Sequence, residues 1–546
     1  MSGALLQLAS MGPQDVYLTS NPEITLFKKV YLRYTNFAIE TAQVSFDGGS
    51  INFSSQQNTN NNTITLPQTG DLISKTVLVL TLNASTSVTQ WGYVNKLGHA
   101  LIDSIQIIVG SSKIDQHKYE WINPYHDLYT NKSHEERYQI MIGDVPELKK
   151  MSTSHPSYNL YIPLNFWYCK ESSSSFPICA LKNQKFQIQI TLRSPLNVIN
   201  YMGTTTPVQS DLPTITTGYV LVDYIYLEKT ERNLFINNNH DYLIEQVQDM
   251  TDSIASINNS TGLTFNKQCK YLIWCIKLSK YFTRTPYLVW ATDDNWNMAL
   301  QLFGKLVWLA TRDGLDAHTD PLNPVIVFND TFVNIGQVPG LVSGGNSILA
   351  SLAAKVSGII LFAENIDGVI TAKAIPDNLV LINNTLTMED MSTTIAEILA
   401  VPTLLDQLNF MKLYAISIID VFNSGNFVDG SDNPIVLSSF QLNGRNKFQQ
   451  RDGFFYNYLQ PYYYFTNSPP DGINTYSFSL NPMDTQPSGT INLGNINSKD
   501  LILTFGKYNT TNQEYFNKSI VGSRLRIFTL SYTHLKIVNG QANLTN

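Results

Sequence analysis

The stretch Phe186-Gln187-Ile188-Gln189-Ile190-Thr191-Leu192 decides the class of fold, because apolar and polar side chains alternate along its whole length. Successive side chains of a β-strand point to opposite faces of the sheet, so this period of two places one face on a core and the other toward solvent. Other segments carry β-branched and aromatic residues on both faces, which predicts strands that are covered twice. These segments are residues 76–82, 101–109, 219–227, 271–278 and 525–535. An all-β chain is therefore expected.

Composition supports strands that are joined by polar turns. Charged residues make up 14% of the 546 residues, below the roughly 25% that is usual for globular chains, whereas hydrophobic residues make up 43%. The 29 Tyr and 26 Phe favour strands, and abundant Asn, Gln, Ser and Thr favour hydrogen-bonding turns. A chain of this length is expected to form two or three units.

The charge pattern argues against direct contact with nucleic acid, because the net charge is −7 and no long cationic run occurs. The first residues show no secretory signal, which predicts synthesis in the cytosol. No apolar stretch reaches the roughly 20 residues that a membrane-spanning helix needs. The cysteines show neither paired CxxC spacing nor the density of a disulfide framework, which predicts buried free thiols. They are Cys169, Cys179, Cys269 and Cys275.

Three landmarks recur in the same order in the two halves of the chain, which predicts a duplicated β-domain. The landmarks are a strand with a glycine turn and a second strand, a Leu-Asn pair, and an aromatic strand. In the first half they are Ile105-Gln106 with Gly110 and Lys113, Leu164-Asn165, and residues 223–227. In the second half they are Phe440-Gln441 with Gly444 and Lys447, Leu480-Asn481, and residues 531–535.

The duplication divides the chain into units. Residues 1–25 form an amino-terminal arm, and residues 26–230 form the first β-domain. The second β-domain consists of residues 231–279 and 433–546. Residues 280–432 between its parts are too many for an ordinary connection, so they are expected to fold by themselves. Because they mix helix-like and strand-like patterns, they are expected to form an inserted surface domain.

No catalytic signature is found, since the sequence has no Gly-x-Ser-x-Gly elbow, no phosphate-binding Gly-rich loop and no HExxH helix. Neither an enzyme activity nor a cofactor is expected. Three acidic residues in a turn-rich segment, Asp313, Asp316 and Asp320, could bind calcium or form a carboxylate pair. Their spacing is not that of an EF-hand, so a solvated turn is the favoured interpretation.

Tyr462-Tyr463-Tyr464-Phe465 could be a platform on which sugars or bases stack. Because no cationic residues are interleaved, a packed strand or a subunit contact is favoured instead. Asn-x-Ser/Thr sequons, for example at Asn83, Asn329 and Asn517, are candidate glycosylation sites. A chain this rich in Asn, Ser and Thr generates sequons by accident, so they predict little.

A series of short blocks runs through the chain. Near the amino terminus the blocks are Gly3-Ala4-Leu5-Leu6-Gln7-Leu8, Gly12-Pro13-Gln14-Asp15-Val16-Tyr17-Leu18-Thr19 and Asn21-Pro22-Glu23-Ile24-Thr25-Leu26-Phe27-Lys28. Later blocks include Tyr161-Ile162-Pro163-Leu164, Phe166-Trp167-Tyr168-Cys169, Tyr242-Leu243-Ile244-Glu245-Gln246, Leu442-Asn443-Gly444 and Gln486-Pro487-Ser488-Gly489-Thr490. The series resembles the major capsid proteins of nucleocytoplasmic large DNA viruses, the mimivirus-like and phycodnavirus-like members in particular.

The resemblance implies two tandem eight-stranded antiparallel jelly rolls, with the large mixed insertion in the second. It further implies a homotrimer with a pseudo-hexagonal outline, which tiles the icosahedral shell of a virion assembled in the host cytoplasm or viral factory. The expected partners are other copies, neighbouring capsomers, minor capsid and penton proteins, and internal membrane proteins. In that family the arm lies toward the inner side of the shell. The arm residues expected to make assembly contacts are Gln14, Asp15, Tyr17, Asn21 and Pro22.

Two alternatives stay open at this point. A minor or paralogous shell component would have the same fold. A lectin-like, carbohydrate-binding β-sandwich would use the tyrosine cluster as its platform and residues 313–320 as a metal or acid site, although it leaves the duplication unexplained.

Overall fold

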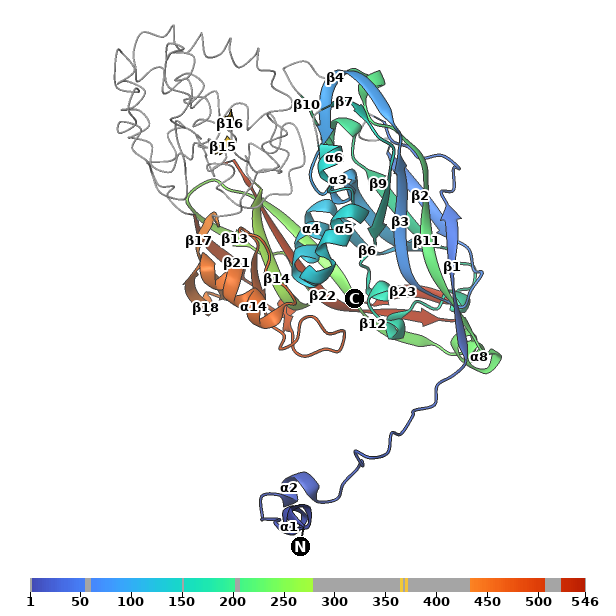
Figure 1. Cartoon of the computed structure of the whole chain (residues 1–546), viewed down its shortest axis with the longest axis vertical. Helices are drawn as coiled ribbons and strands as arrows, with labels where there is room; N and C mark the ends of the chain where they lie inside the picture. The colour runs from blue at the N-terminus through green and yellow to red at the C-terminus, as the bar shows by residue number, and fades with distance from the viewer. Residues whose placement is uncertain are drawn as a thin grey trace, which may run out of the picture.

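The computed structural model describes residues 2–54, 60–149, 152–201, 207–277, 364–366, 369–371, 433–505 and 522–545. Its strands form two groups that follow each other along the chain (Figure 1). We call the strands between Phe37 and Leu227 the first roll, and those between His240 and Thr545, β15 and β16 excepted, the second roll.

The first roll has two four-stranded antiparallel sheets. One has the order β1 (Phe37–Ser45), β11 (Ile215–Leu227), β3 (Leu72–Leu82) and β8 (Tyr158–Pro163). The other has the order β2 (Asn61–Leu66), β9 (Phe186–Leu192), β5 (Ile102–Val109) and β6 (Ser112–Lys118). A small third sheet joins β10 (Ile199–Tyr201), β4 (Ser85–Tyr93) and β7 (Ser152–His155).

The second roll repeats this arrangement. One sheet has the order β12 (His240–Ser253), β22 (Arg524–Val538), β14 (Gln268–Lys277) and β19 (Asn474–Ser477), with β20 (Ile491–Asn492) and β23 (Gln541–Thr545) attached. The other has the order β13 (Asn258–Gly262), β21 (Lys499–Phe505), β17 (Ile435–Leu442) and β18 (Arg445–Asp452). Counted along the chain, the eight main strands of each roll lie in the same orders, 1-8-3-6 and 2-7-4-5. This topology confirms the expected pair of eight-stranded jelly rolls.

The three landmarks fall on equivalent strands. The glycine turns connect β5 to β6 and β17 to β18, the fourth and fifth strands of each roll. Asn443 and Gly444 have φ angles of 48° and 75°, the left-handed pair that a two-residue hairpin turn requires. The Leu-Asn pairs follow the sixth strands, and the aromatic segments lie in the eighth strands, β11 and β22.

Side-chain alternation accounts for the cores. Along β9, Phe186, Ile188, Ile190 and Leu192 are buried in the first core, and the residues between them are half-buried, as the period of two predicts. Nine of the ten residues of β14 are buried. Its two faces lie in two different clusters, one inside the second roll and one against the first, so this strand is covered twice as expected.

Short helices connect the strands, and several were not predicted. The helices are α1 (Gly3–Ala9), α2 (Val16–Thr19), α3 (Leu97–Leu101), α4 (Tyr119–Tyr129), α5 (Glu135–Met141), α6 (Pro146–Lys149), α7 (Trp167–Lys170), α8 (Lys229–Asn237), the π-helix η9 (Phe455–Leu459) and α14 (Gln460–Tyr464). Single 3-10 turns are η2 (Lys132–His134), η3 (Ser172–Ser174), η4 (Ile178–Ala180), η5 (Pro195–Asn197), η6 (Gln209–Asp211) and η10 (Leu493–Asn495).

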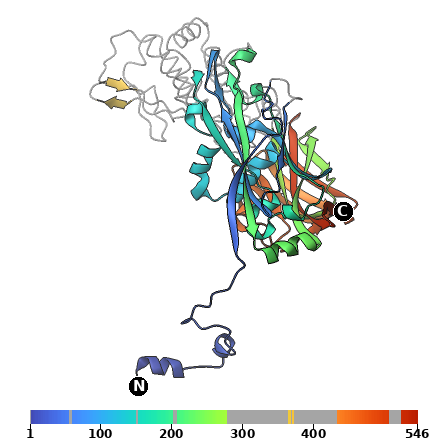
Figure 2. The ribbon, with the colours of Figure 1, turned by 90° about the vertical axis from the view of Figure 1, so that its right-hand side faces the viewer.

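Two parts of the chain lie apart from the rolls. Residues 2–36 leave the body at the start of β1 and run away from it (Figures 1 and 2). Of residues 280–432, the structure describes the strands β15 (Glu364–Ile366) and β16 (Val369–Thr371), and the rest lie outside the described residues. No described helix is long and apolar enough to cross a membrane.

Candidate functional site

Helix α4 of the first roll covers the outer face of the second roll. It follows β6 directly and places Trp121, Tyr125 and Leu128 in one buried cluster with residues of the second roll. Those residues are Tyr271, Ile273 and Cys275 of β14, Phe528 and Leu530 of β22, and Phe465 and Ile473. We call the contact between the rolls the junction. Burial of the aromatic and aliphatic side chains in the junction supplies the main attraction between the two rolls.

The two rolls also meet along the edges of their sheets. The Asp115 carboxylate in β6 accepts a hydrogen bond of 3.1 Å from the backbone N–H of Val247 in β12. The side-chain amide of Gln246 donates to the backbone carbonyl of Ile114, at 2.6 Å. The fifth strand of the first roll is therefore aligned with the first strand of the second roll.

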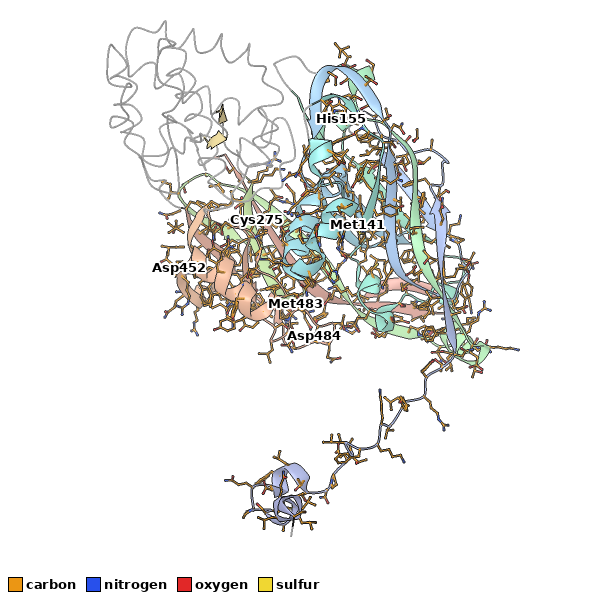
Figure 3. All side chains as sticks on the ribbon, viewed as in Figure 1. Met141, His155, Cys275, Asp452, Met483 and Asp484 are labelled. Carbon is orange, nitrogen blue, oxygen red and sulfur yellow. The ribbon has the colours of Figure 1, made fainter. Side chains whose placement is uncertain are left out.

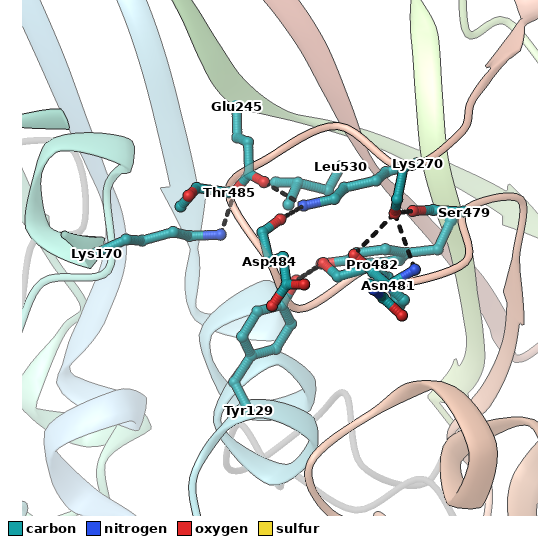
Figure 4. Close-up of polar contacts among 12 residues, drawn as sticks. Tyr129, Lys170, Glu245, Lys270, Ser479, Asn481, Pro482, Asp484, Thr485 and Leu530 are labelled. Atoms are coloured by element: carbon teal, nitrogen blue, oxygen red, sulfur yellow. Dashed lines mark hydrogen bonds and ion pairs between the residues drawn. The ribbon is translucent and has the colours of Figure 1, made fainter. Parts of the chain in front are cut away.

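A buried ionic cluster crosses the junction (Figure 4). The Glu245 carboxylate in β12 contacts both Lys170 of α7 and Lys270 of β14, one lysine from each roll. The Lys270 side chain is fully buried, and that of Glu245 is 8% exposed. Burial opposes ionisation of Glu245, yet the two ammonium groups hold the pKa of this carboxyl below its usual value. The cluster therefore keeps its charges inside the protein.

The loop of residues 479–490 closes this cluster. Lys270 donates to the backbone carbonyl of Asp484, at 2.7 Å, and Thr485 donates to Glu171 of the first roll. The Tyr129 hydroxyl donates to the carbonyl of Pro482, at 3.4 Å. Figures 3 and 4 show this loop, with Met483 and Asp484, beside α4. The loop contains the Gln486-Pro487-Ser488-Gly489-Thr490 block of the family resemblance.

A second ionic cluster lies at the other end of α4. Arg526 of β22 binds Glu120 at 2.7 Å and Asp249 of β12 at 3.1 Å. Lys118, the last residue of β6, binds the same Asp249 oxygen at 2.8 Å. Lys277 is nearly buried, and its ammonium lies 3.8 Å from Glu120. Burial lowers the pKa of Lys277 to about 8. The contacts of Arg526 and Lys277 with Glu120 restrict how the rolls are rotated relative to each other, because buried charges tolerate few other partners. The Lys118–Asp249 pair lies nearer the surface.

The junction has the features of a structural contact. Its lysines and arginine are engaged by carboxylates, and burial raises the pKa values of its tyrosines. Among the described residues, no group of three or more His, Cys, Asp and Glu side chains could hold a metal ion. The arrangement can hold two rolls in one fixed orientation.

The predicted arm residues lie away from the junction. Asp15 accepts a hydrogen bond of 2.7 Å from the backbone of Gly12 at the start of α2, and the Tyr17 side chain is 92% exposed. Gln14, Asn21 and Pro22 are exposed. The structure shows no contact of these residues with the body, so their role in assembly stays a prediction.

The other predicted sites have mixed outcomes. Residues 462–465 do not form a strand, because Pro461 lies in the first turn of the short helix α14. Tyr462 and Tyr463 are exposed in this helix, and Phe465, which follows it, is buried. The Asn83 side chain donates to Thr214 at 2.8 Å and accepts from Thr216 at 2.6 Å. Asp313, Asp316, Asp320, Asn329 and Asn517 lie outside the described residues.

Comparison with protein families identifies the chain. The family model for the amino terminus of major capsid proteins matches residues 25–228, and the model for the major capsid protein of large eukaryotic DNA viruses matches residues 379–543. The chain belongs to the major capsid proteins of large DNA viruses. The two matches leave residues 1–24 and 229–378 outside the family models, which includes β12, β13 and β14 of the second roll and part of the insertion.

Relatives and solved structures agree with this family. Capsid protein 1 of Acanthamoeba polyphaga mimivirus is 29% identical, covering 100% of this chain and 99% of its own length. The major capsid protein of Phaeocystis pouchetii virus is 28% identical over the same shares. The capsid of PBCV-1, Paramecium bursaria Chlorella virus 1, gives a TM-score of 0.59 at 23% identity, covering 96% of this chain and 100% of that one. The Faustovirus major capsid protein gives 0.58 at 9% identity and shares the fold.

Sequence reasoning missed the junction of this capsid protein. Its charged residues stand far apart along the chain and look like ordinary surface charges. One signal was present, because Lys270 and Lys277 interrupt a strand that is otherwise apolar on both faces. Charges within such a strand need buried partners.

Proposed function

We propose that three copies of this capsid protein form a pseudo-hexagonal capsomer, which tiles the icosahedral outer shell of a large double-stranded DNA virus. The capsid role and a place in the virus particle follow from family membership. The observation that carries the finer proposal is the repeated topology of the two rolls. Three chains then present six similar units around one axis, so near-hexagonal packing needs a single gene product.

The junction supports this proposal physically. A capsomer has to keep its shape while neighbouring capsomers contact it in the shell. Two rolls that share an apolar cluster and buried ion pairs behave as one rigid block, because opening the junction would expose charges and aromatic rings together. A single chain is therefore a preformed third of the capsomer.

Several finer proposals follow the same reasoning. The arm, residues 1–25, contacts minor capsid proteins, penton proteins, internal membrane proteins or neighbouring capsomers on the inner side of the shell. Residues 280–432 form the outward-facing insertion, since loops at the end of a sandwich tolerate additions. The rolls themselves are residues 26–230, and 231–279 with 433–546. The protein has no enzymatic role and no direct contact with nucleic acid, and it assembles in the host cytoplasm.

The test is the mass of the purified chain measured by light scattering. Three chain masses of 61.4 kDa each are expected. A strict monomer under native conditions would contradict the capsomer. A second candidate role, a minor or paralogous shell component, has the same fold, and counting copies per virus particle separates it from the major component. The lectin-like alternative does not account for the whole-length family match.

A further inference from the structure

A hollow of about 520 Å³ lies in the second roll, where two strands of its six-stranded sheet meet end to end. β12 pairs with one edge of β22 along its length, so β14 and β23 share the other edge. The pairing of β14 stops at Gln268 with Tyr532, and that of β23 stops at Thr545 with His534. These four residues line the hollow, which therefore opens between the two strand ends.

Backbone contacts hold the wall of the hollow beside β14. The N–H of Leu493 in η10 donates to the carbonyl of Lys267 at 3.1 Å, and the side chain of Asn492 accepts from the N–H of Gly494 at 3.0 Å. Glycine is needed at 494, because a Cβ there would lie 2.6 Å from the carbonyl oxygen of Asn266. The backbone around the hollow is thus fixed before a ligand arrives, which lowers the entropic cost of binding.

The face of the sheet that carries the hollow points away from the first roll. Leu535 and Ile537 of β22 are buried in the core of the first roll. By alternation, His534 and Lys536 lie on the opposite face, as does Asp241 of β12, which pairs with Lys536. Their side chains are 44% to 55% exposed. Figure 1 shows β12 along the lower margin of the body, the margin from which the arm also leaves.

Basic groups outnumber carboxylates in the hollow. Lys267, His534 and Lys536 line it, and Asp241 is the one carboxylate among its described lining residues. The Asp241 carboxylate contacts His534 at 2.9 Å and Lys536 at 3.6 Å, and these contacts hold its pKa below the usual value. Two basic groups thus share one carboxylate. The hollow keeps an excess of positive charge, although the whole chain has a net charge of −7.

Lys267 is the cation of the hollow that has no counter-ion within the described part of the chain. Its ammonium donates to the side-chain oxygens of Gln246 and Thr533, which are both neutral. Burial lowers the pKa of Lys267, and the charge of Asp115, which is beyond ion-pair distance, opposes this only in part. The Asp115 carboxylate is itself bonded to the backbone of Val247. A half-buried ammonium with neutral partners is stabilised when an anion enters beside it.

We propose that this hollow binds a phosphate group, which Lys267, Lys536 and His534 hold by charge. A doubly charged anion matches three basic groups that share a single carboxylate, and lysine ammonium groups bind phosphate as point charges. The side chains of Gln268 and Thr545 supply further hydrogen-bond donors. The hollow has room for a phosphate carried on a larger group, so free phosphate and a phospholipid headgroup are the two sources to separate. The site does not depend on the proposed capsomer.

The experiment uses the purified full-length chain in two binding assays. The chain is titrated with inorganic phosphate in a calorimeter, and it is sedimented with phosphatidylcholine vesicles that either contain or lack phosphatidic acid. Saturable binding of inorganic phosphate is expected. Sedimentation that requires phosphatidic acid would identify a lipid headgroup as the source, whereas phosphate binding without sedimentation would identify free phosphate. A chain that binds neither inorganic phosphate nor phosphatidic acid would overturn the proposal.

Substitutions locate the site. Lys267→Gln and Lys536→Gln should each weaken binding about ten-fold, because each removes one charge-assisted contact. Asp241→Asn should tighten binding, since the carboxylate no longer competes with the anion for His534 and Lys536, and a damaged fold would not produce this gain. Lys132→Gln, an exposed position in η2 that does not line the hollow, is the matched control. Binding that is indifferent to Lys267→Gln and Asp241→Asn would place the anion elsewhere and overturn this site.

Discussion

The hydroxyl groups of Tyr129 and Tyr271 lie 2.9 Å apart across the junction, one on α4 of the first roll and one on β14 of the second. Tyr271 is fully buried, and its neighbours are aromatic and aliphatic side chains. This polar contact therefore has few substitutes on the Tyr271 side. The contact between the two hydroxyl groups fixes the position of α4 along β14.

Replacement of one hydroxyl should cost more than replacement of both. Tyr129→Phe leaves the buried Tyr271 hydroxyl without this partner, so the free energy of unfolding should fall by about 1–3 kcal/mol. The double variant Tyr129→Phe, Tyr271→Phe should recover much of that loss, because neither hydroxyl is then left behind. Urea unfolding monitored by fluorescence measures both. Additive losses in the double variant would show that the two hydroxyls do not act as a pair.

Glu245 should be the most sensitive charge at the junction. Glu245→Gln leaves Lys170 and Lys270 near each other without their carboxylate, and an uncompensated buried charge costs about 3–5 kcal/mol. The expected result is a lower midpoint in chemical denaturation. Glu136→Gln, at an exposed position in α5, is the matched control and should change the midpoint little. Equal midpoints for the two variants would mean that the cluster adds no stability.

Period-two alternation predicted the strands well, because the sheet face to which a side chain points depends only on its position along the strand. Residues 186–192 and β9 coincide, and the glycine turn at Gly444 lies in the hairpin between β17 and β18. The junction was not predictable in this way. Glu245 and Lys170 are distant in sequence, and only the docking of two finished rolls brings them together.

Helices were harder to foresee than strands. The residues of α14 are mostly tyrosines, which favour strands, yet Pro461 supplies the fixed φ angle that suits the first turn of a helix. Helix α8, which connects β11 to β12, was not predicted either. In both places the connection between sheets determines the local geometry, and it overrides the secondary-structure propensity of the residues.

The four cysteines should resist modification in the folded protein. All are free thiols, and burial raises their pKa values, to about 12 for Cys169 and about 11 for Cys179. Since the thiolate is the reactive form, alkylation at pH 8 should be slow until the chain is unfolded. A thiol-reactive dye, used with and without denaturant, measures this difference. Cys179 should react first, because it is only half-buried and has the lower of the two stated values. Rapid native labelling of Cys275 would contradict the buried strand.

Two buried histidines sit together under α5. His99 is fully buried and His126 is 3% exposed, and both rings contact Tyr138. Burial lowers the pKa of both histidines, for His99 with help from His126 and Lys96, and for His126 against the opposing pull of Asp127 and Glu135. The fold therefore favours the neutral rings.

Acidification should then destabilise the protein. Below the unfolded pKa of about 6.5 the unfolded chain binds protons that the folded chain does not, so stability falls as the pH drops toward the lower folded values. Each histidine contributes up to about 1.4 kcal/mol per pH unit. Unfolding free energies measured between pH 7 and pH 5 give the slope. His99→Gln should flatten it, whereas His134→Gln, at an exposed position, should not. An unchanged slope for His99→Gln would exclude this source of acid sensitivity.

Removal of the amino-terminal segment should separate capsomer formation from shell assembly. Residues 2–36 expose many large apolar side chains, including Leu18, Leu26 and Phe27 at 87% to 98%, and they run away from both rolls (Figure 2). Apolar side chains at such exposure need a partner outside the chain. Because residues 2–14 make no contact with the junction, their deletion should leave trimers at the wild-type mass while assembled particles become rare by electron microscopy. Deletion that abolished the trimer would instead place the arm within the capsomer, and normal particles from the deleted chain would remove it from assembly altogether.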